Sequence, residues 1–457
     1  MNAPRVDLLP AALLEPEWER LLLLAYCLMQ TRQGHALADE DLQQLARLKA
    51  LVDNLRAPGG AWTQVLGGTG ADAPTASGPE FDVLAAVAAP EFEPSLGGAF
   101  QQLQAGAGGN ASPYPSRALL QELLALDAGR AHLLSDALSP QGLPRRRRLV
   151  RVDQEGAYQP LLPEPALLAR LAGRDWTPPP PPGAELVPLQ AGWDDLVLPP
   201  DRRAMLHEYL LWVRHRATVV DRWGGASVGG PVALFSGPSG TGKTLAASVV
   251  ANCLGHWPLY RVDLGRVVSK YVGETEENLN RLFDAAHGRP MVLQFDEADA
   301  LFAKRGEVKE ARDRYANMEV SHLLSRIETH QGPCILTTNL RRQLDSAFTR
   351  RLQVVIEFPR PDITARAALW QRLLPPRAPR EPGVDPAWLA DCAALTGGQI
   401  RNAALHAAYL AAGADTPIGL PHVALGVWRE LSKDGREVAR TELGALAPYL
   451  PEELARA

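Results

Sequence analysis

The feature that most constrains the fold is the run PVALFSGPSGTGKTLAASVVANCLG at residues 231–255. An apolar, β-branched stretch leads directly into a glycine-rich turn, and an alanine-rich stretch typical of a helix follows. The turn contains GxxxxGK[ST] between Gly237 and Thr244, in the strand–loop–helix context that this motif requires. The run therefore predicts a buried strand whose carboxyl end opens into a phosphate-binding loop.

Each residue type in this loop suits phosphate chemistry. Glycines let backbone N–H groups converge on phosphate oxygens, and the positive end of the following helix dipole points at them. Lys243 is expected to neutralise β- and γ-phosphate charge, and the Thr244 hydroxyl to hold Mg²⁺. The predicted ATP-binding residues are Gly237, Pro238, Ser239, Gly240, Thr241, Gly242, Lys243, Thr244 and Leu245.

A second apolar run, PMVLQFDEAD, predicts a buried strand that ends in adjacent carboxylates. In a parallel sheet such a strand delivers its last residues to the ligand crevice at the carboxyl edge. Asp296 is then expected to coordinate Mg²⁺, and Glu297 to polarise the water that attacks the γ-phosphate. Taken together with the glycine-rich loop, the two carboxylates predict ATP hydrolysis.

These motifs, followed by Asn339, by Arg350 and Arg351, and by GGQIR at 397–401, resemble AAA+ ATPases across about 240 residues. The resemblance implies that Asn339 is sensor 1 and that Arg401 is sensor 2, on a small helical lid. It implies that Arg350 and Arg351 include the arginine finger that reaches the neighbouring subunit's nucleotide. The shortened TRRLQV leaves open which of the two is the main finger.

Two other readings of the same region are rejected. The string DEAD at 296–299 is shared with RNA helicases, but the chain continues with ILTTN and LDSAFTRRLQVVIEFP instead of a helicase's later motifs. No HExxH follows the ATPase region, which argues against a built-in zinc protease.

The segment SKYVGETEENLNRLFDAA resembles the first pore loop of protein-remodelling AAA+ members. By that resemblance Tyr271 grips a protein substrate in the channel of a homo-oligomeric ring, a hexamer, with Lys270 and Val272 flanking it. The alternative is a tyrosine packed at the start of a helix. A longer string, 295–328, resembles AAA+ proteins encoded with bacterial contractile injection systems, whose tail components are then candidate partners.

The region before the ATPase motifs predicts an adaptor. Helical patterns are followed by RRRRLVRVD and AYQPLLP, which favour a small hairpin, so a winged helix is expected. Arg145 to Arg148 could contact nucleic-acid phosphates, but an Arg-rich edge on an acidic protein is more often solvated or docks a protein. A DNA-directed loader and an ATP-gated assembly scaffold remain the alternatives to protein remodelling.

The sequence thus predicts an α/β P-loop domain with five parallel strands, near Val232, Leu259, Val292, Ile335 and Val354, a four-helix lid and a helical N-terminal module. A helix before the first of these strands is expected to bury Leu206, Leu210, Leu211 and Val213. The predicted boundaries are 1–56 helical segment, 57–78 Gly/Ala/Pro-rich linker, 79–176 winged-helix-like adaptor, 177–192 proline-rich linker, 193–360 ATPase domain, 361–435 lid and 436–457 C-terminal tail.

Composition sets the remaining limits. The formal net charge of -5 provides no global attraction for nucleic acid. The four cysteines are far apart and lack zinc-site or disulfide-framework spacing, which favours a cytoplasmic protein. The most apolar run, LLLLAYCLM, is shorter than the roughly 20 residues needed to cross a bilayer, so no membrane association is expected.

Overall fold

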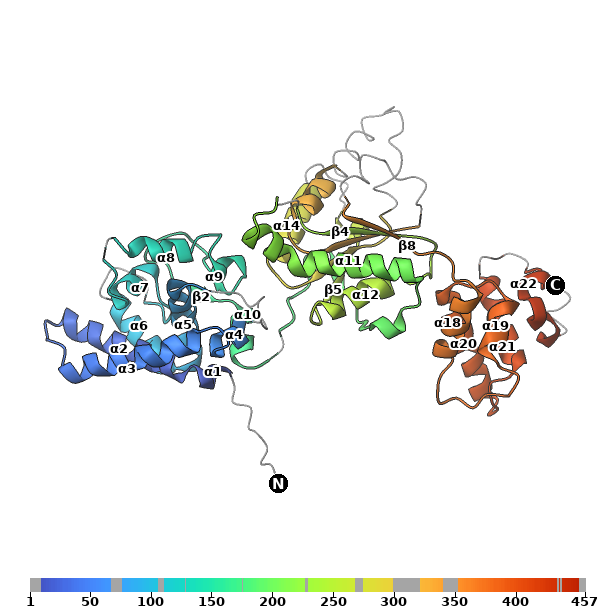
Figure 1. Cartoon of the computed structure of the whole chain (residues 1–457), viewed down its shortest axis with the longest axis horizontal. Helices are drawn as coiled ribbons and strands as arrows, with labels where there is room; N and C mark the ends of the chain where they lie inside the picture. Colours follow the sequence, from blue (N-terminus) through green and yellow to red (C-terminus); the bar gives the residue numbers. More distant parts are fainter. Residues whose placement is uncertain are drawn as a thin grey trace, which may run out of the picture. The chain divides into compact units, whose positions relative to one another are not determined.

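The structure is a computed structural model of the chain. It describes residues 10–66, 76–105, 111–127, 129–174, 176–226, 229–267, 274–298, 321–339, 352–433, 435 and 438–451. The chain divides into two compact units, Met1–Pro178 and Pro179–Ala457, which are considered separately below (Figure 1).

The first unit is mainly helical. Its helices are α1 Pro10–Leu13, α2 Glu15–Arg32, α3 Asp39–Arg56, α4 Ala61–Leu66, α5 Gly78–Phe92, α6 Pro94–Ala105, α7 Arg117–Leu123, α8 Ala131–Ala137, α9 Leu143–Arg146 and α10 Pro165–Leu171. Two short strands, β1 Val150–Arg151 and β2 Leu162–Pro163, pair antiparallel between α9 and α10.

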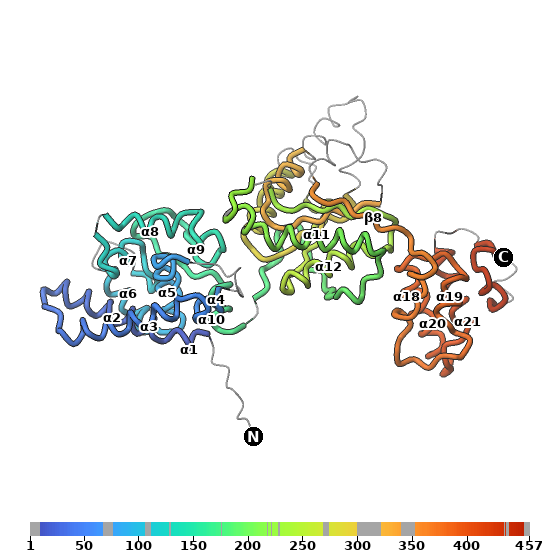
Figure 2. Tube along the Cα trace, viewed as in Figure 1, coloured from blue at the N-terminus to red at the C-terminus, as the bar shows by residue number. Residues whose placement is uncertain are grey.

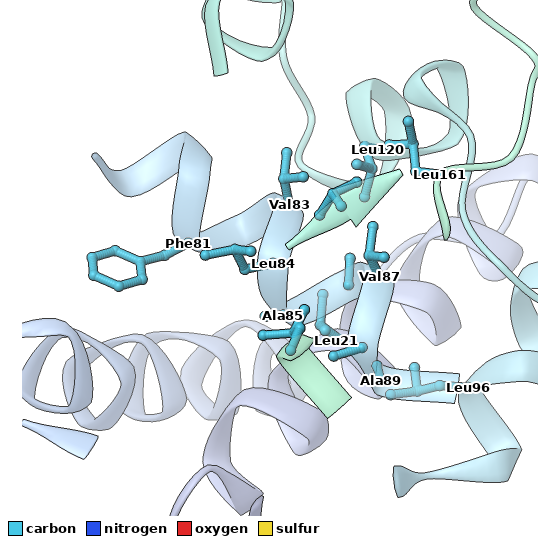
Figure 3. Packing of buried hydrophobic residues seen from close by; sticks show 14 of the residues in the cluster. Leu21, Phe81, Val83, Leu84, Ala85, Val87, Ala89, Leu96, Leu120 and Leu161 are labelled. Atoms are coloured by element: carbon cyan, nitrogen blue, oxygen red, sulfur yellow. The ribbon is translucent and has the colours of Figure 1, made fainter. Parts of the chain in front are cut away.

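Helix α5 is the centre of this unit. Every side chain from residue 83 to residue 89 is fully buried, so this stretch of the helix is apolar on all sides, as expected where other helices enclose it. Figure 3 shows Leu84 and Val87 of α5 among the side chains of Leu21 and Leu120, which come from α2 and α7. One hydrophobic cluster thus joins residues that are far apart in the sequence.

The predicted linker 57–78 contains an ordered, buried helix. Helix α4 lies inside it, and the Trp62 side chain is fully buried. The same core includes Leu21 from the predicted segment 1–56 and Leu167 from the predicted adaptor. Residues 1–56 and 79–176 therefore share one core, and the Gly- and Pro-rich composition around Trp62 conceals the helix that helps to join them.

A buried ionic network connects four helices of the first unit. Glu17 is fully buried, and its two carboxylate oxygens accept hydrogen bonds from Arg56 at 2.7 and 2.9 Å. The Trp62 indole N–H donates to the same carboxylate at 3.0 Å, and Arg56 also reaches Asp82 at 2.9 Å. Burial by itself would lower the pKa of Arg56, but the hydrogen bonds and charges of Glu17 and Asp82 reverse this and raise it.

The arginine run does not form the strand that RRRRLVRVD predicted. Arg145 and Arg146 lie in helix α9, because Pro144 occupies its first turn, where proline is favourable. Strand β1 begins only at Val150, after Arg148 adopts a positive φ of 47°. The observed hairpin is two residues long in each strand.

The second unit is built on a six-stranded sheet. Its strands are β3 Ala184–Leu186, β4 Val232–Ser236, β5 Leu259–Val262, β6 Val292–Phe295, β7 Cys334–Thr338 and β8 Val354–Glu357. Helices connect and cover them: η2 Trp193–Asp195, α11 Pro200–Ala217, η3 Thr218–Arg222, α12 Lys243–Cys253, α13 Leu264–Val267 and α14 Glu274–Ala286, together with a helix at 321–329.

The strand order is β3-β5-β6-β7-β4-β8. The five strands from β4 to β8 are parallel, as predicted. The sequence missed β3, which lies in the predicted linker 177–192 and pairs antiparallel with β5 at the sheet edge. Glu185 and Leu186 are exposed, so this short strand lacks the apolar signature of a buried one.

Helices cover both faces of this sheet. Helix α14 and the helix at 321–329 pack on the face that carries Leu293 and Phe295, and α11 and α12 pack on the opposite face. On α11 the buried side chains are Leu206, Tyr209 and Leu210. The prediction that Leu211 is buried is wrong: it is 48% exposed, because the helical spacing of i, i+3 and i+4 selects Tyr209 instead.

After β8 the chain forms a helical subdomain, drawn in orange to red in Figure 2. This subdomain has its own hydrophobic core. It contains α18 Ile363–Leu373, α19 Pro386–Cys392, α20 Gly397–Gly413 and α21 Leu420–Leu431, followed by α22 Arg440–Leu443 and η5 Gly444–Tyr449. Leu443 and Leu446 are buried in this core, so part of the predicted tail 436–457 packs against the helices.

Among the helices that the structure describes, none combines the length and the apolar character required to cross a membrane.

We expect Glu17→Gln to destabilise the first unit by about 3–5 kcal/mol, because it leaves the guanidinium of Arg56 buried with one carboxylate fewer. Hydrogen exchange of the α5 amides measures this loss locally. Asp153→Asn is the matched control, since its pair with Arg151 is more than half exposed and should change stability by less than about 1 kcal/mol. Equal exchange rates in the two variants would contradict a stabilising role for the network.

A second expectation concerns pH. His330 is buried against the Phe283 ring, 5.4 Å between centroids, and burial, followed by the charges of His287 and Arg326, lowers its pKa to about 4. A histidine in the unfolded chain has a pKa of about 6.5. Between this pH and pH 4 the unfolded chain therefore binds a proton at His330 that the folded chain does not bind. The contribution of His330 to the free energy of unfolding is therefore fully present above pH 6.5. It is lost as the pH falls toward 4, by up to roughly 3 kcal/mol.

His330→Gln, which stays neutral throughout, should remove this part of the pH dependence. Urea unfolding of the full chain at pH 7, 6 and 5 measures the difference between the variant and the wild type. His256→Gln, at an exposed histidine, serves as the control and should retain the wild-type slope. A wild-type slope in His330→Gln as well would show that other groups account for the pH dependence.

Candidate active site

The glycine-rich loop joins the end of β4 at Ser236 to the start of α12 at Lys243. Gly237, Gly240 and Gly242 all have positive φ, at 147°, 76° and 99°. A Cβ on Gly237 would lie 2.2 Å from the Phe358 carbonyl oxygen, so a side chain has no room there. The loop is thus held against β8, and the N-terminus of α12, a favourable position for an anion, opens at its other end.

Lys243 holds the loop in place. Its Nζ donates hydrogen bonds to the carbonyl oxygens of Gly237 and Pro238 at 2.7 and 3.0 Å, and to Oδ1 of Asn339 at 2.9 Å. Asn339 follows β7, so the ammonium group connects the loop with the adjacent strand. The predicted residues Lys243 and Asn339 are therefore direct neighbours.

Two carboxylates follow β6 at the same edge of the sheet. Asp296 accepts a hydrogen bond from the Thr337 hydroxyl, a contact that the sequence did not predict. Glu297 is exposed and has a positive φ of 50°, a strained conformation for a residue with a side chain. The Ala298 N–H donates to the Thr337 carbonyl oxygen at 2.9 Å, which fixes the turn that carries Glu297.

These groups line one cavity of about 960 Å³. Its walls come from the glycine-rich loop, the ends of β6 and β7, the segment before α11, and the helical subdomain. The lining residues include Asp195, Leu196, Ser239, Gly240, Thr241, Gly242, Lys243, Thr244, Leu245, Asp296, Glu297, Thr337, Asn339, Arg360, Gly397, Gly398 and Arg401.

The helical subdomain contacts the loop through the N-terminus of α20. The Gly398 N–H donates to the Gly240 carbonyl oxygen at 2.8 Å, and Thr396 caps the helix. Arg401 lies on the first turns of α20 and lines the cavity. The sequence predicted Arg401 here, but its motifs did not reveal the backbone contact between Gly398 and Gly240.

Several predicted site residues lie outside the described part of the chain. They are the pore-loop residues Lys270, Tyr271 and Val272 and the candidate fingers Arg350 and Arg351. Their roles therefore stay predictions from the sequence.

Part of the chain that lines this cavity matches a known family. Residues 233–360 match the model of the ATPase family associated with various cellular activities, AAA. The chain therefore contains an AAA family ATPase domain.

Curated relatives match part of the chain. An uncharacterised AAA family ATPase of Sinorhizobium fredii is 44% identical over 131 residues, 28% of this chain and 39% of the relative. Fidgetin-like protein 1 of Xenopus tropicalis is 31% identical over 178 residues, 38% of this chain and 26% of the relative. The proteasome-associated ATPase of Thermobifida fusca is 33% identical over 172 residues, 33% of this chain and 29% of the relative.

The chain thus spans between about a quarter and two fifths of the length of these relatives. The matched domain and the ATPases among the relatives support ATP hydrolysis.

The contact between Gly240 and α20 gives a prediction. In Gly240→Ala the new Cβ would lie 2.8 Å from Thr396 Oγ1, at a φ of 76° that disfavours alanine, so loop and helix must separate. Overpacking of this kind costs about 1–3 kcal/mol, and we expect ADP affinity to fall about tenfold. In Gly255→Ala the φ of 92° is equally unfavourable but nothing lies within 4 Å. Equal ADP affinities of these two variants, measured by calorimetry, would contradict the contact's role.

Proposed function

We propose that the chain uses ATP hydrolysis in this cavity to remodel a protein partner, and that it works as a homo-oligomeric ring. The observation that carries the proposal is the convergence of Lys243, Thr244, Asp296, Glu297 and Asn339 on one cavity at the carboxyl edge of a parallel sheet. Ligands of open α/β sheets bind at this edge. The proposal gives each group a separate task in phosphoryl transfer.

The donor set fits Mg²⁺. Thr244 supplies a hydroxyl and Asp296 a carboxylate, and hard cations of this kind prefer oxygen ligands. Bound with ATP, Mg²⁺ neutralises charge that develops on the phosphate oxygens. Lys243 binds the β- and γ-phosphates, Glu297 takes the proton of the attacking water, and Asn339 helps to orient that water. The backbone N–H groups from residue 239 to residue 245 cradle the phosphates.

The remaining predicted residues complete the proposal. Arg401 contacts ATP from the helical subdomain, which serves as a lid, and Arg350 or Arg351 reaches the nucleotide of the next subunit in a hexamer. Lys270, Tyr271 and Val272 contact the substrate in the ring's channel. This set rests on the sequence resemblance to protein-remodelling AAA+ members.

The partner in this proposal is a protein. Relatives named fidgetin-like protein 1 and proteasome-associated ATPase are compatible with a protein-directed machine. The resemblance of 295–328 to proteins encoded with contractile injection systems makes tail components the first class to test. The N-terminal unit selects the partner through the winged-helix-like adaptor proposed for residues 79–176, which includes the β1–β2 hairpin.

The contacts of the arginine run weigh against the nucleic-acid alternative. Arg145 donates to Glu155 at 2.7 Å and to the Leu138 carbonyl oxygen at 3.1 Å. Arg147 donates to the Leu66 carbonyl oxygen at 3.0 Å, and burial, followed by the charges of Arg170 and Arg146, lowers its pKa to about 10. At least two of the four guanidiniums are thus engaged within the unit.

Two variants separate nucleotide binding from hydrolysis. Glu297→Gln should bind ATP with an affinity within a few-fold of the wild type but hydrolyse it at least about 10²-fold more slowly, because the amide cannot accept the proton. Lys243→Ala should lose ATP binding itself. Calorimetry and phosphate release measure the two quantities. Normal turnover by Glu297→Gln would remove Glu297 from the role of base.

The same variant tests the remodelling function. Glu297→Gln loaded with ATP should retain tail-component partners that the wild type releases, and Tyr271→Ala should hydrolyse ATP but leave the partner unchanged. Capture of a partner followed by mass spectrometry reads out the first effect. A Tyr271→Ala variant that remodels its partner at the wild-type rate would refute the pore role while leaving the ATPase intact.

A further inference from the structure

Gln294 is a polar side chain at a position where the rest of the strand is apolar. It lies in β6, all four residues of which are buried, and its own side chain is 0% exposed. Alternation along β6 puts Leu293 and Phe295 in the core on the α14 face. Val292, two residues before Gln294, belongs to the opposite core. Gln294 therefore faces α12, toward the start of the glycine-rich loop's helix.

The Gln294 amide uses its nitrogen but not its oxygen in hydrogen bonds to the described residues. Its Nε2 donates to Thr244 Oγ1 at 3.2 Å. Its Oε1 has no hydrogen-bond partner within the part of the chain that the structure describes. A buried acceptor without a partner costs about 1–3 kcal/mol, which an apolar residue at this position would avoid. Such an exception calls for a functional explanation.

The hydrogen-bonding capacity of the Thr244 hydroxyl offers a functional explanation for the unpaired Oε1. A hydroxyl has one proton to donate and two lone pairs to offer, and a glutamine amide can both donate and accept. In the observed arrangement the amide donates to a lone pair of the Thr244 oxygen. When that oxygen lends its lone pair to a cation, its proton points away from the cation and needs an acceptor. Rotation of the Gln294 amide, whose terminal torsion is broad and roughly two-fold, presents Oε1 to that proton.

Another acceptor beside the site, the Asp296 carboxylate, has a partner of its own through one of its two oxygens. Asp296 accepts a hydrogen bond from Thr337, on the neighbouring strand β7. Gln294 is the side chain that contacts the Thr244 hydroxyl from the sheet, as far as the described residues extend. The unpaired Oε1 thus belongs to the amide that already contacts the Thr244 hydroxyl, where rotation lets it accept the hydroxyl proton when the Thr244 oxygen becomes a ligand.

We propose that Gln294 is a positioning residue for the metal: it holds the Thr244 hydroxyl and accepts its proton when the Thr244 oxygen binds Mg²⁺. This inference rests on the proposed function, because it requires Thr244 to be a metal ligand. It assigns to Gln294 no contact with ATP. Its effect should therefore appear in metal affinity and not in metal-free nucleotide binding.

Gln294→Met tests the inference with a side chain of similar length that cannot accept the proton. The measurement is binding of fluorescent ADP to the full chain, in EDTA and across a titration with Mg²⁺. We expect the affinity in EDTA to stay within two-fold of the wild type. The Mg²⁺ concentration at half-maximal effect should rise about 10- to 100-fold, the usual consequence of removing a partner of a metal ligand. Thermal stability should be equal or higher, because the unpaired Oε1 is gone.

Thr244→Ala, which removes the proposed metal ligand itself, distinguishes the role of Gln294 from the metal role of Thr244. If Thr244→Ala shifts the Mg²⁺ dependence and Gln294→Met does not, the inference is wrong and the proposed function stands. If neither variant shifts it, the metal role of Thr244 fails and the inference with it. If Gln294→Met does not fold, Gln294→Asn is decisive: it keeps an amide but is one methylene too short to reach Thr244, and it should show the same shift.

Discussion

The second unit depends on the register of its parallel strands. Ser236 at the end of β4 pairs with Thr338 of β7 on one side and with Glu357 of β8 on the other, and Phe295 of β6 pairs with Leu336. Strands β4, β6 and β7 therefore end at one edge, and the residues that follow them meet there. Because each ladder is fixed by backbone hydrogen bonds inside two apolar layers, the strand ends that carry the loop, the carboxylates and Asn339 keep their separations. The Lys243 side chain adds a bond between the loop and Asn339.

The parallel strands were predictable because burial on both faces leaves nearly continuous apolar runs in the sequence. Strand β3 was not, since Glu185 lies on an exposed edge and prolines precede it. Helix α4 was not predicted because its six residues lie in a Gly- and Pro-rich stretch. Its contribution to the core is evident from the burial of Trp62 and the hydrogen bond between Trp62 and Glu17. Short elements stabilised by tertiary contacts carry little local signal.

The candidate site was also predictable only in part from the sequence. The glycine-rich loop and the pair Asp296 and Glu297 are contiguous motifs, so their chemistry is readable from neighbouring residues. The contacts that organise them are not contiguous: Lys243 and Asn339 are 96 residues apart, and Gln294 and Thr244 are 50. A buried glutamine inside an apolar strand was visible in the sequence, but its meaning depends on the helix that packs against that face of the sheet. The sequence predicted which groups form the candidate site, and the structure shows which residues they contact.

The contacts of Lys243 link the loop to the strand beside it. An ammonium group has three donors, and the carbonyl oxygens of Gly237 and Pro238 and the amide oxygen of Asn339 occupy three. A phosphate bound by Lys243 must therefore displace at least one of these acceptors. Displacing a loop carbonyl would remove a bond within the glycine-rich loop, whereas displacing Asn339 leaves both bonds of Lys243 to the loop in place. The exchange at Asn339 therefore preserves the bonds within the loop, and a phosphate gives the ammonium group a charged acceptor in place of a neutral one.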